Sequence, residues 1–345
     1  MASTAQKAQK RTPVKKTQPA AKAIVAGPLY ATRPEAMAAA DAIAERNGIN
    51  ADWVRQAVGH ARFLPTVARA IAPAPIGTPK NWAVYRSRFI DPIRTAAGVK
   101  FWQANREALA RAEQAYGVPA EIVVGIVGVE TIYGQQTGNF RVIDALATLA
   151  FDFPQSHPRA KVRSAYFLSE LEAYLLLTQG TDTDPMALRG SYAGAMGLPQ
   201  FMPSSWRKYA IDFDGDGHID LFHSATDVIG SVANYFKAFG WQKDMPTHYA
   251  LQFNPAKLDM ASLMAPDILP TFTPAAMADK GVELDAAAQL HPGLLALVEL
   301  QNGAAAPQYL AGTANFYAIT RYNWSSYYAM AVIELGKDIA AAMPK

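Results

Sequence analysis

Through most of the chain, apolar and polar positions follow the pattern of helices, and glycine or proline stands near the expected helix ends. An alanine-rich helix is predicted over 35–47, closing at Gly48. A second helix, capped by Asn50 or Asp52, is predicted to run toward His60. Further helices are predicted over residues 82–94, 101–116, 144–151, 164–178, 227–239 and 325–343.

The segment 119–133 is apolar on nearly every side, which is typical of a buried helix or a buried strand. Its length favours a helix despite the many β-branched residues. Pro119 suits the first turn of a helix, and Gly134 supplies a stop. We therefore predict a buried helix here.

Strands have little support elsewhere, apart from a region late in the chain. Residues 248–253 and the proline-rich span reaching Lys280 predict short strands and loops, and the Pro/Gly-rich stretch 72–80 predicts a loop. The fold class predicted is mainly α, of the α+β kind. No internal repeat is visible.

Composition limits the classes of protein that the chain can be. It has 345 residues, of which 50% are hydrophobic, so it can build substantial cores. Its apolar runs fall short of the roughly 20 residues that a membrane span needs. The N-terminal residues lack an apolar core of signal-peptide length, so we expect a soluble protein whose export signal is absent or removed. Without cysteine, it has no disulfide, thiolate metal site or cysteine nucleophile.

Basic residues are concentrated at the N-terminus. Six of them precede Gly27, and removing them from the formal net charge of +3 leaves about −3 for the rest of the chain. Residues 1–27 are therefore predicted to form a disordered basic tail. A nucleic-acid-binding protein would normally carry its basic surface on the folded part, so we expect no nucleic-acid partner.

Glu130 is the only acid between residues 122 and 143, at the end of the predicted buried helix. Burial and the negative end of the helix dipole should both raise its pKa. A carboxylic acid that stays protonated near neutral pH is suited to general acid catalysis of glycosidic cleavage. The pattern alone leaves a second interpretation open, in which Glu130 pairs with a buried arginine.

The segment 212–220 has the acid spacing of a calcium-binding loop. Asp212, Asp214 and Asp216 take the first, third and fifth positions, and His218 offers a backbone carbonyl at the seventh. The twelfth position lacks the usual glutamate, so Asp227 must complete the ligand set. The alternative is an acidic turn in which Asp227 caps the next helix.

Three motifs occur together and in order: Glu-Thr-Ile-Tyr-Gly at 130–134, Gly-Ser-Tyr-Ala-Gly-Ala-Met-Gly-Leu-Pro-Gln-Phe-Met-Pro-Ser-Ser at 190–205, and Val-Ala-Asn-Tyr-Phe at 232–236. With Phe-Asp-Phe-Pro at 151–154 and Asn-Phe-Tyr-Ala-Ile-Thr-Arg-Tyr-Asn at 315–323, they closely resemble the membrane-bound lytic murein transglycosylase B family. The resemblance extends from about Asp41 to Lys337.

The resemblance implies a site in which Glu130 acts first as acid and then as base. Ser191 and Gln200 match positions that hydrogen-bond the sugar at the cleavage point. The groove for the glycan would be lined by Tyr85, Tyr235, Tyr322 and Asn323. Paired arginines that the family often carries after Phe-Asp-Phe-Pro are missing, and Arg163 is the best equivalent. Stacking on aromatic faces also suits amphipathic sugar rings.

The resemblance also implies a domain organisation. An N-terminal helical domain would span 28–100, a lysozyme-like catalytic core with the calcium loop 101–243, a small β-containing subdomain 244–300, and a segment returning to the groove 301–345. The family's variant calcium loop implies structural Ca²⁺ at Asp212, Asp214, Asp216, His218 and Asp227, and no organic cofactor is expected. A lipid anchor needs an N-terminal cysteine, so a soluble periplasmic member is expected.

The implied reaction cleaves the bond between N-acetylmuramic acid and N-acetylglucosamine in peptidoglycan without water, leaving 1,6-anhydromuramic acid ends. A hydrolytic muramidase is the first alternative and would need a second carboxylate facing Glu130, for which Asp144 and Asp152 are candidates. A non-catalytic peptidoglycan-binding module is the second. The expected partners are glycan strands, and other cell-wall enzymes are a further candidate.

Overall fold

The computed structural model describes residues 25–72 and 79–344. The predicted tail over 1–27 and the predicted loop over 72–80 therefore lie mostly outside the described residues. Within this part of the chain, no helix is long and apolar enough to cross a membrane.

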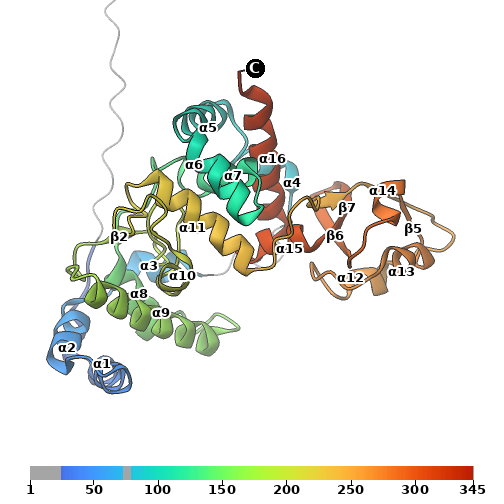
Figure 1. The fold of residues 1–345 in the computed structure, drawn as a ribbon. Coiled ribbons are helices and arrows are strands. Elements are labelled where there is room, and N and C mark those ends of the chain that lie inside the picture. Colours follow the sequence, from blue (N-terminus) through green and yellow to red (C-terminus); the bar gives the residue numbers. More distant parts are fainter. Residues whose placement is uncertain (1–24, 73–78, 345) are drawn as a thin grey trace, which may run out of the picture.

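A body of packed helices forms most of the molecule, and a smaller region with strands projects from one side (Figure 1). The helices of the body are α1 (Pro34–Asn47), α2 (Ala51–His60), α3 (Pro65–Ala70), α4 (Trp82–Arg86), α5 (Pro92–Ala104), α6 (Arg106–Tyr116), α7 (Ala120–Thr131), α8 (Val142–Phe151), α9 (Ala160–Gly180), α10 (Pro203–Tyr209), α11 (Ala225–Ala238), α15 (Ala314–Thr320) and α16 (Ser326–Ala342). The prediction of a mainly helical fold is confirmed.

Helices α7 and α16 approach each other backbone to backbone, because glycines stand where they meet. A Cβ atom on Gly125 of α7 would lie 2.4 Å from the carbonyl oxygen of Val332. A Cβ on Gly336 of α16 would lie 2.2 Å from the carbonyl oxygen of Glu121. This contact places residues of the last helix beside the end of the buried helix α7 (Figure 1).

The N-terminal helices are attached to α8 and the residue after it by hydrogen bonds that two aspartates accept. Asp144 accepts a hydrogen bond from the backbone N–H of Arg62 at 2.9 Å. Asp152, which follows α8, accepts one from the hydroxyl of Tyr30 at 2.5 Å and pairs with Arg33 at 3.2 Å. The helical segments that precede residue 72 are thereby attached to the helical body.

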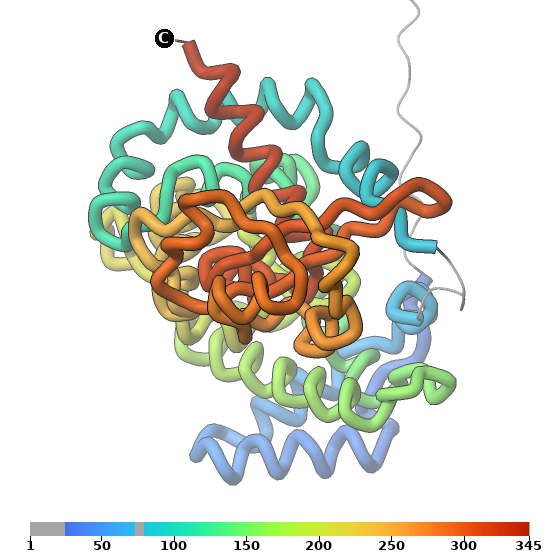
Figure 2. The backbone as a smooth tube through the Cα atoms, turned by 90° about the vertical axis from the view of Figure 1, so that its right-hand side faces the viewer, coloured from blue at the N-terminus to red at the C-terminus, as the bar shows by residue number. Residues whose placement is uncertain are grey.

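The projecting region contains two small antiparallel sheets. One has the order β3-β7-β6, made of β3 (His248–Tyr249), β7 (Ala305–Gly312) and β6 (Ala296–Asn302). The other pairs β4 (Leu251–Phe253) with β5 (Val282–Leu284). In Figure 2 this region faces the viewer, with the first helices at the bottom. The strands predicted near 248–253 are confirmed, and the β6–β7 hairpin crosses the predicted boundary at residue 300.

Three short helices lie beside these sheets: α12 (Met260–Met264), α13 (Pro274–Asp279) and α14 (Ala286–Gln289). The first two fall in the span to Lys280 that was predicted as strands and loops, so that prediction is wrong for them. Side chains at their N-caps explain the difference, since Asp259 and Thr273 each accept a backbone hydrogen bond from the first turn.

Several predicted helix boundaries are wrong for local reasons. The helix predicted over 82–94 ends at Arg86, because Asp91 caps a new helix that begins with Pro92. The helix predicted over 101–116 is divided at Asn105. Helix α7 starts after Pro119 and stops at Thr131, before Gly134.

Candidate active site

Glu130 lies in the last turn of α7, where it retains some solvent-exposed surface. Burial of its carboxyl group raises its pKa from 4.5 to about 7, while a hydrogen bond from Tyr328 acts in the opposite direction. The Tyr328 hydroxyl donates to Oε1 of Glu130 at 2.5 Å. No ion pair in the described residues includes Glu130, so the alternative of a buried arginine partner finds no support there.

The backbone after Glu130 turns sharply, which fixes the end of α7 against a second segment. Ile132 and Tyr133 both adopt left-handed conformations, with φ of 51° and 55°. The hydroxyl of Thr131 donates to the carbonyl of Leu198 at 2.8 Å and accepts from the N–H of Gly134 at 3.0 Å. Glu130 is thereby held beside the segment that carries Ser191 and Gln200.

Ser191 and Gln200 are both half-buried and partly hydrogen-bonded. Oγ of Ser191 accepts from the N–H groups of Ala193 and Ala195 at 3.3 and 3.1 Å. Nε2 of Gln200 donates to the carbonyls of Thr137 and Gly197 at 3.1 and 2.9 Å. Within the described chain, the hydroxyl proton of Ser191 and Oε1 of Gln200 therefore remain available to a ligand.

Gln200 also has a strained backbone, with φ of 52°. Strain of this kind persists where the surrounding structure holds a side chain in place, often at binding sites. Contact of Ser191 and Gln200 with a sugar stays a prediction.

Tyrosines surround the Glu130 carboxyl group. Its charge contributes to the raised pKa values of Tyr85, Tyr322 and Tyr328, although burial is the larger cause in each. The rings of Tyr322 and Tyr328 lie 6.3 Å apart and nearly parallel. The structure thus brings two of the predicted groove residues, Tyr85 and Tyr322, close to Glu130.

Tyr235 is only 6% exposed, and its predicted contact with the glycan stays a prediction. Its hydroxyl donates to the carbonyl of Arg321 at 2.7 Å, and its ring packs 4.9 Å from that of Tyr322. The hydroxyl of Tyr322 donates in turn to the carbonyl of Pro199 at 2.5 Å. Tyr235 is therefore placed to support Tyr322.

The remaining groove predictions lie at the surface. Asn323 is exposed. Arg163, on α9, places its guanidinium 5.2 Å from the ring of Phe167 and 5.7 Å from that of Tyr166. Neither residue is a cause of the pKa shift of Glu130, and their contact with the glycan stays a prediction.

Sequence reasoning missed Tyr328. Tyr328 stands in the helix predicted over 325–343, but a buried tyrosine at this position is equally compatible with ordinary packing. Only the approach of α16 to α7 shows that its hydroxyl reaches Glu130.

The two candidates for a second catalytic carboxylate are both paired with residues other than Glu130. Asp144 is 5% exposed and pairs with Arg141 at 2.7 Å. Asp152 is bound to Tyr30 and Arg33. Neither carboxylate is a cause of the pKa shift of Glu130, which agrees with a site that works with a single carboxyl group.

Three acids of the predicted calcium loop come together. Carboxylate oxygens of Asp212, Asp214 and Asp227 lie within 4.8 Å of one another. Oxygen donors of this kind suit a hard divalent cation such as Ca²⁺. Asp227 is buried, and its carboxylate accepts from the N–H groups of Phe213 and Asp220, both at 2.8 Å.

Asp216 and His218 lie outside this group of three. The carboxylate of Asp216 accepts a hydrogen bond from the backbone N–H of His218 at 2.8 Å, and its part in binding a metal stays a prediction. The alternative function of Asp227 is also wrong, because Ser224 caps α11 and Asp227 binds back to the loop.

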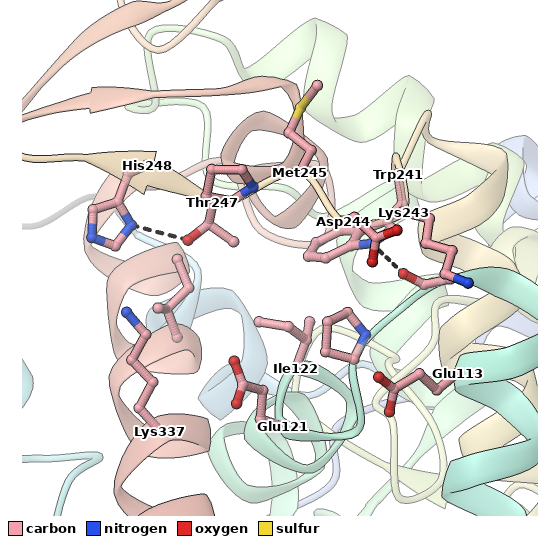
Figure 3. Close-up of a pocket in the computed structure, with 14 residues that line it drawn as sticks. Glu113, Glu121, Ile122, Trp241, Lys243, Asp244, Met245, Thr247, His248 and Lys337 are labelled. Carbon is pink, nitrogen blue, oxygen red and sulfur yellow. Dashed lines mark hydrogen bonds between the residues drawn. The ribbon is translucent and has the colours of Figure 1, made fainter. Parts of the chain in front are cut away.

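A cavity of 370 Å³ lies at the opposite end of α7, between Glu121, Trp241 and Lys337 (Figure 3). Glu130 does not line this cavity. It is therefore separate from the candidate active site.

Comparisons with known proteins agree with this geometry. Residues 32–337 match the model described as the transglycosylase SLT domain. The chain is 40% identical over 328 residues to the membrane-bound lytic murein transglycosylase B of Escherichia coli K12, covering 91% of this chain and 84% of that protein.

Three solved structures are also similar. The lytic transglycosylase Slt35 of E. coli, in complex with bulgecin A, is 40% identical with a TM-score of 0.79, covering 92% of this chain and 96% of that one. Slt35 has also been solved in complex with calcium, with a TM-score of 0.76 and the same identity and coverage. The soluble lytic transglycosylase SltB1 of Pseudomonas aeruginosa is 40% identical with a TM-score of 0.78, covering 90% of this chain and 99% of that one.

Proposed function

The chain belongs to the lytic murein transglycosylase B family, and we propose that Glu130 is both its catalytic acid and its catalytic base. The protein is a lytic transglycosylase that acts on peptidoglycan. The observation that carries the proposal is a single buried carboxyl group whose pKa is raised to about 7 beside a hydrogen-bond donor. Such a group can give up a proton near neutral pH and take one back.

In the first step, Glu130 protonates the oxygen that joins N-acetylmuramic acid to N-acetylglucosamine. The bond from that oxygen to C1 of the muramyl ring then breaks through an oxocarbenium-like state. Because Tyr328 donates to Oε1, the acid proton resides on Oε2. The same tyrosine stabilises the carboxylate once the proton has left.

In the second step, the Glu130 carboxylate removes the proton of the muramyl C6 hydroxyl. The C6 oxygen bonds to C1, the 1,6-anhydro ring closes, and Glu130 is protonated again without consuming water. We assign Ser191 and Gln200 to holding the muramyl ring, through the hydroxyl proton and the amide oxygen that remain free for a ligand. Holding the C6 hydroxyl near C1 gives it the advantage of proximity over water.

The product distinguishes this reaction from hydrolysis. Digested peptidoglycan is expected to yield muropeptides ending in 1,6-anhydromuramic acid, each one water lighter than the hydrolytic product by mass spectrometry. Catalytically inactive protein incubated in the same way provides the blank. Reducing-end products from the native protein would identify a hydrolytic muramidase instead.

We propose further that the loop around Asp212 binds one Ca²⁺ with a structural role, through Asp212, Asp214 and Asp227. The proposal is supported by the calcium complex of the related Slt35. An ion held there would offset two of the three carboxylate charges at the start of α11, the helix that carries Tyr235. The backbone carbonyl of His218 remains a predicted additional ligand.

Calcium is therefore expected to raise thermal stability. At about 100 times its dissociation constant, a ligand that binds only the folded state adds roughly 2.7 kcal/mol. We expect chelation to lower the melting temperature by roughly 5 °C. Asp214→Asn should reduce this response, whereas the matched control Asp216→Asn should keep it, because Asp216 lies outside the group of three. Identical melting with and without chelator would show that the loop is an acidic turn without a metal.

We place the activity in the periplasm, because its substrate lies there, and its partners are the glycan strands of peptidoglycan. Binding to other cell-wall enzymes remains a prediction.

A further inference from the structure

Two adjoining hollows lie between α2 and the loop that follows α9. Their volumes are 530 and 170 Å³, and they share Trp53, Asp184 and Pro185 as lining residues. The first is also lined by Gln179 and Thr183, and the second by Gln56 and His60. None of the residues that surround Glu130 lines either hollow.

The loop that forms one wall is held by its own hydrogen bonds. The N–H of Thr183 donates to the carbonyl of Thr178 at 2.8 Å, and that of Ala187 to the carbonyl of Asp184 at 2.9 Å. The hydroxyl of the fully buried Tyr174 donates to the carbonyl of Pro185 at 2.8 Å. A ligand would therefore meet a preformed surface and would not have to order the loop on binding.

The chemistry of the lining suits a sugar. Trp53 is half-buried, and within the described chain its indole N–H has no acceptor. Around it lie amides, a hydroxyl group and carboxylates, which hydrogen-bond sugar hydroxyl and acetamido groups. An aromatic face with a few polar groups matches the amphipathic ring of a hexosamine. The exposed acids Asp182 and Asp184 disfavour phosphate-rich ligands such as nucleic acid.

We propose that these hollows form a second, non-catalytic site for the amino-sugar chain of peptidoglycan, centred on Trp53. The choice of this polymer as the ligand rests on the function proposed above. The polymer bound at Trp53 also presents glycosidic bonds to Glu130, on the same strand or on a neighbouring strand of the wall. Binding at Trp53 therefore raises the effective concentration of cleavable bonds at Glu130. A strand too short to span both sites would gain nothing.

The test compares long and short substrates in the full-length protein. Binding to intact sacculi is measured by sedimentation in the Glu130→Gln background, so that the wall is not digested. About 0.3 M salt suppresses long-range attraction by the basic N-terminal residues. Trp53→Ala is expected to weaken this binding about tenfold, which corresponds to about 1.4 kcal/mol. The kcat/KM of Trp53→Ala with otherwise native Glu130 on a soluble tetrasaccharide strand should stay within about twofold of the native value.

Two further variants separate binding from folding. Gln179→Ala changes an exposed side chain of the hollow at the end of α9, so it should keep the native melting temperature and still weaken binding to sacculi. Trp102→Ala removes a tryptophan on α5, outside the hollows, and should leave binding unchanged after correction for the folded fraction. Native binding by both Trp53→Ala and Gln179→Ala would overturn the proposal. So would equal losses on sacculi and on the tetrasaccharide, whereas failure of the function proposed for Glu130 would show in the products of the native protein.

Discussion

Glu130→Gln is expected to lower turnover of peptidoglycan by roughly 10³-fold or more while leaving glycan binding intact. General acid or base catalysis typically contributes about 10² to 10⁴ to a rate, and here one carboxyl group supplies both. The glutamine amide has no acidic proton to donate and cannot accept the proton of the C6 hydroxyl. Its oxygen can still accept the hydrogen bond of Tyr328, so the local packing should persist. Release of soluble muropeptides is the measurement.

Glu121→Gln is the matched control, because Glu121 lies in the first turn of the same helix, away from the tyrosines around Glu130. It should turn over at the native rate. The melting temperature of Glu130→Gln above pH 7 should be no lower than that of the native protein. The folded-state pKa of Glu130 is raised above its unfolded value, so ionisation at higher pH destabilises the native fold, and the amide avoids this. Native activity in Glu130→Gln would refute the mechanism.

The same carboxyl group is expected to determine how the rate of the native enzyme depends on pH. Glu130 must be protonated to act as the acid, and its pKa is about 7. The rate should therefore fall as pH rises through about 7, approaching a tenfold loss per pH unit above it. Any residual activity of Glu130→Gln should lack this fall.

The proposed catalytic carboxyl group could be predicted because its signal is local. A lone acid in an otherwise apolar helix indicates burial wherever the helix packs. Its partner Tyr328 lies 198 residues further along the chain, and nothing in the spacing of either helix indicates that they meet. The same limit applies to Tyr235, where a motif marked the residue but only packing shows that it supports Tyr322.

Helix boundaries and metal ligands are harder to predict, because single side chains can override the pattern of apolar and polar positions. The apolar positions of 82–94 continue past Ser87, but the Asp91–Pro92 pair starts a new helix there. In the acidic loop, regular spacing predicts Asp216 as a ligand, whereas the structure groups only Asp212, Asp214 and Asp227 closely, so the full ligand set stays a prediction. The β6–β7 hairpin was not predicted as strands, and the first half of β7, which begins at Ala305, is exposed and has no alternating apolar pattern.

Packing of α16 on α7 is what brings Tyr328 to Glu130, and Gly336→Ala should disturb it. In an ordinary helix, replacing glycine by alanine stabilises by up to about 1 kcal/mol. Here the new Cβ would lie 2.2 Å from the backbone carbonyl oxygen of Glu121, which no rotamer change can relieve. We expect the free energy of unfolding to fall by roughly 2–3 kcal/mol, measured by denaturant titration.

Gly180→Ala gives the matched control, because Gly180 ends α9 with no atom within 4 Å of an added Cβ. It should leave the free energy of unfolding unchanged or raise it slightly. The same glycine-to-alanine change is therefore expected to destabilise the protein at Gly336 and not at Gly180. Gly336→Ala should also lower kcat measured on the folded fraction, since any outward shift of α16 moves the Tyr328 hydroxyl away from Oε1 of Glu130. Loss of stability without loss of kcat would show that the glycine contact contributes to folding alone. Native stability of Gly336→Ala would show that α16 can move away from α7 without cost.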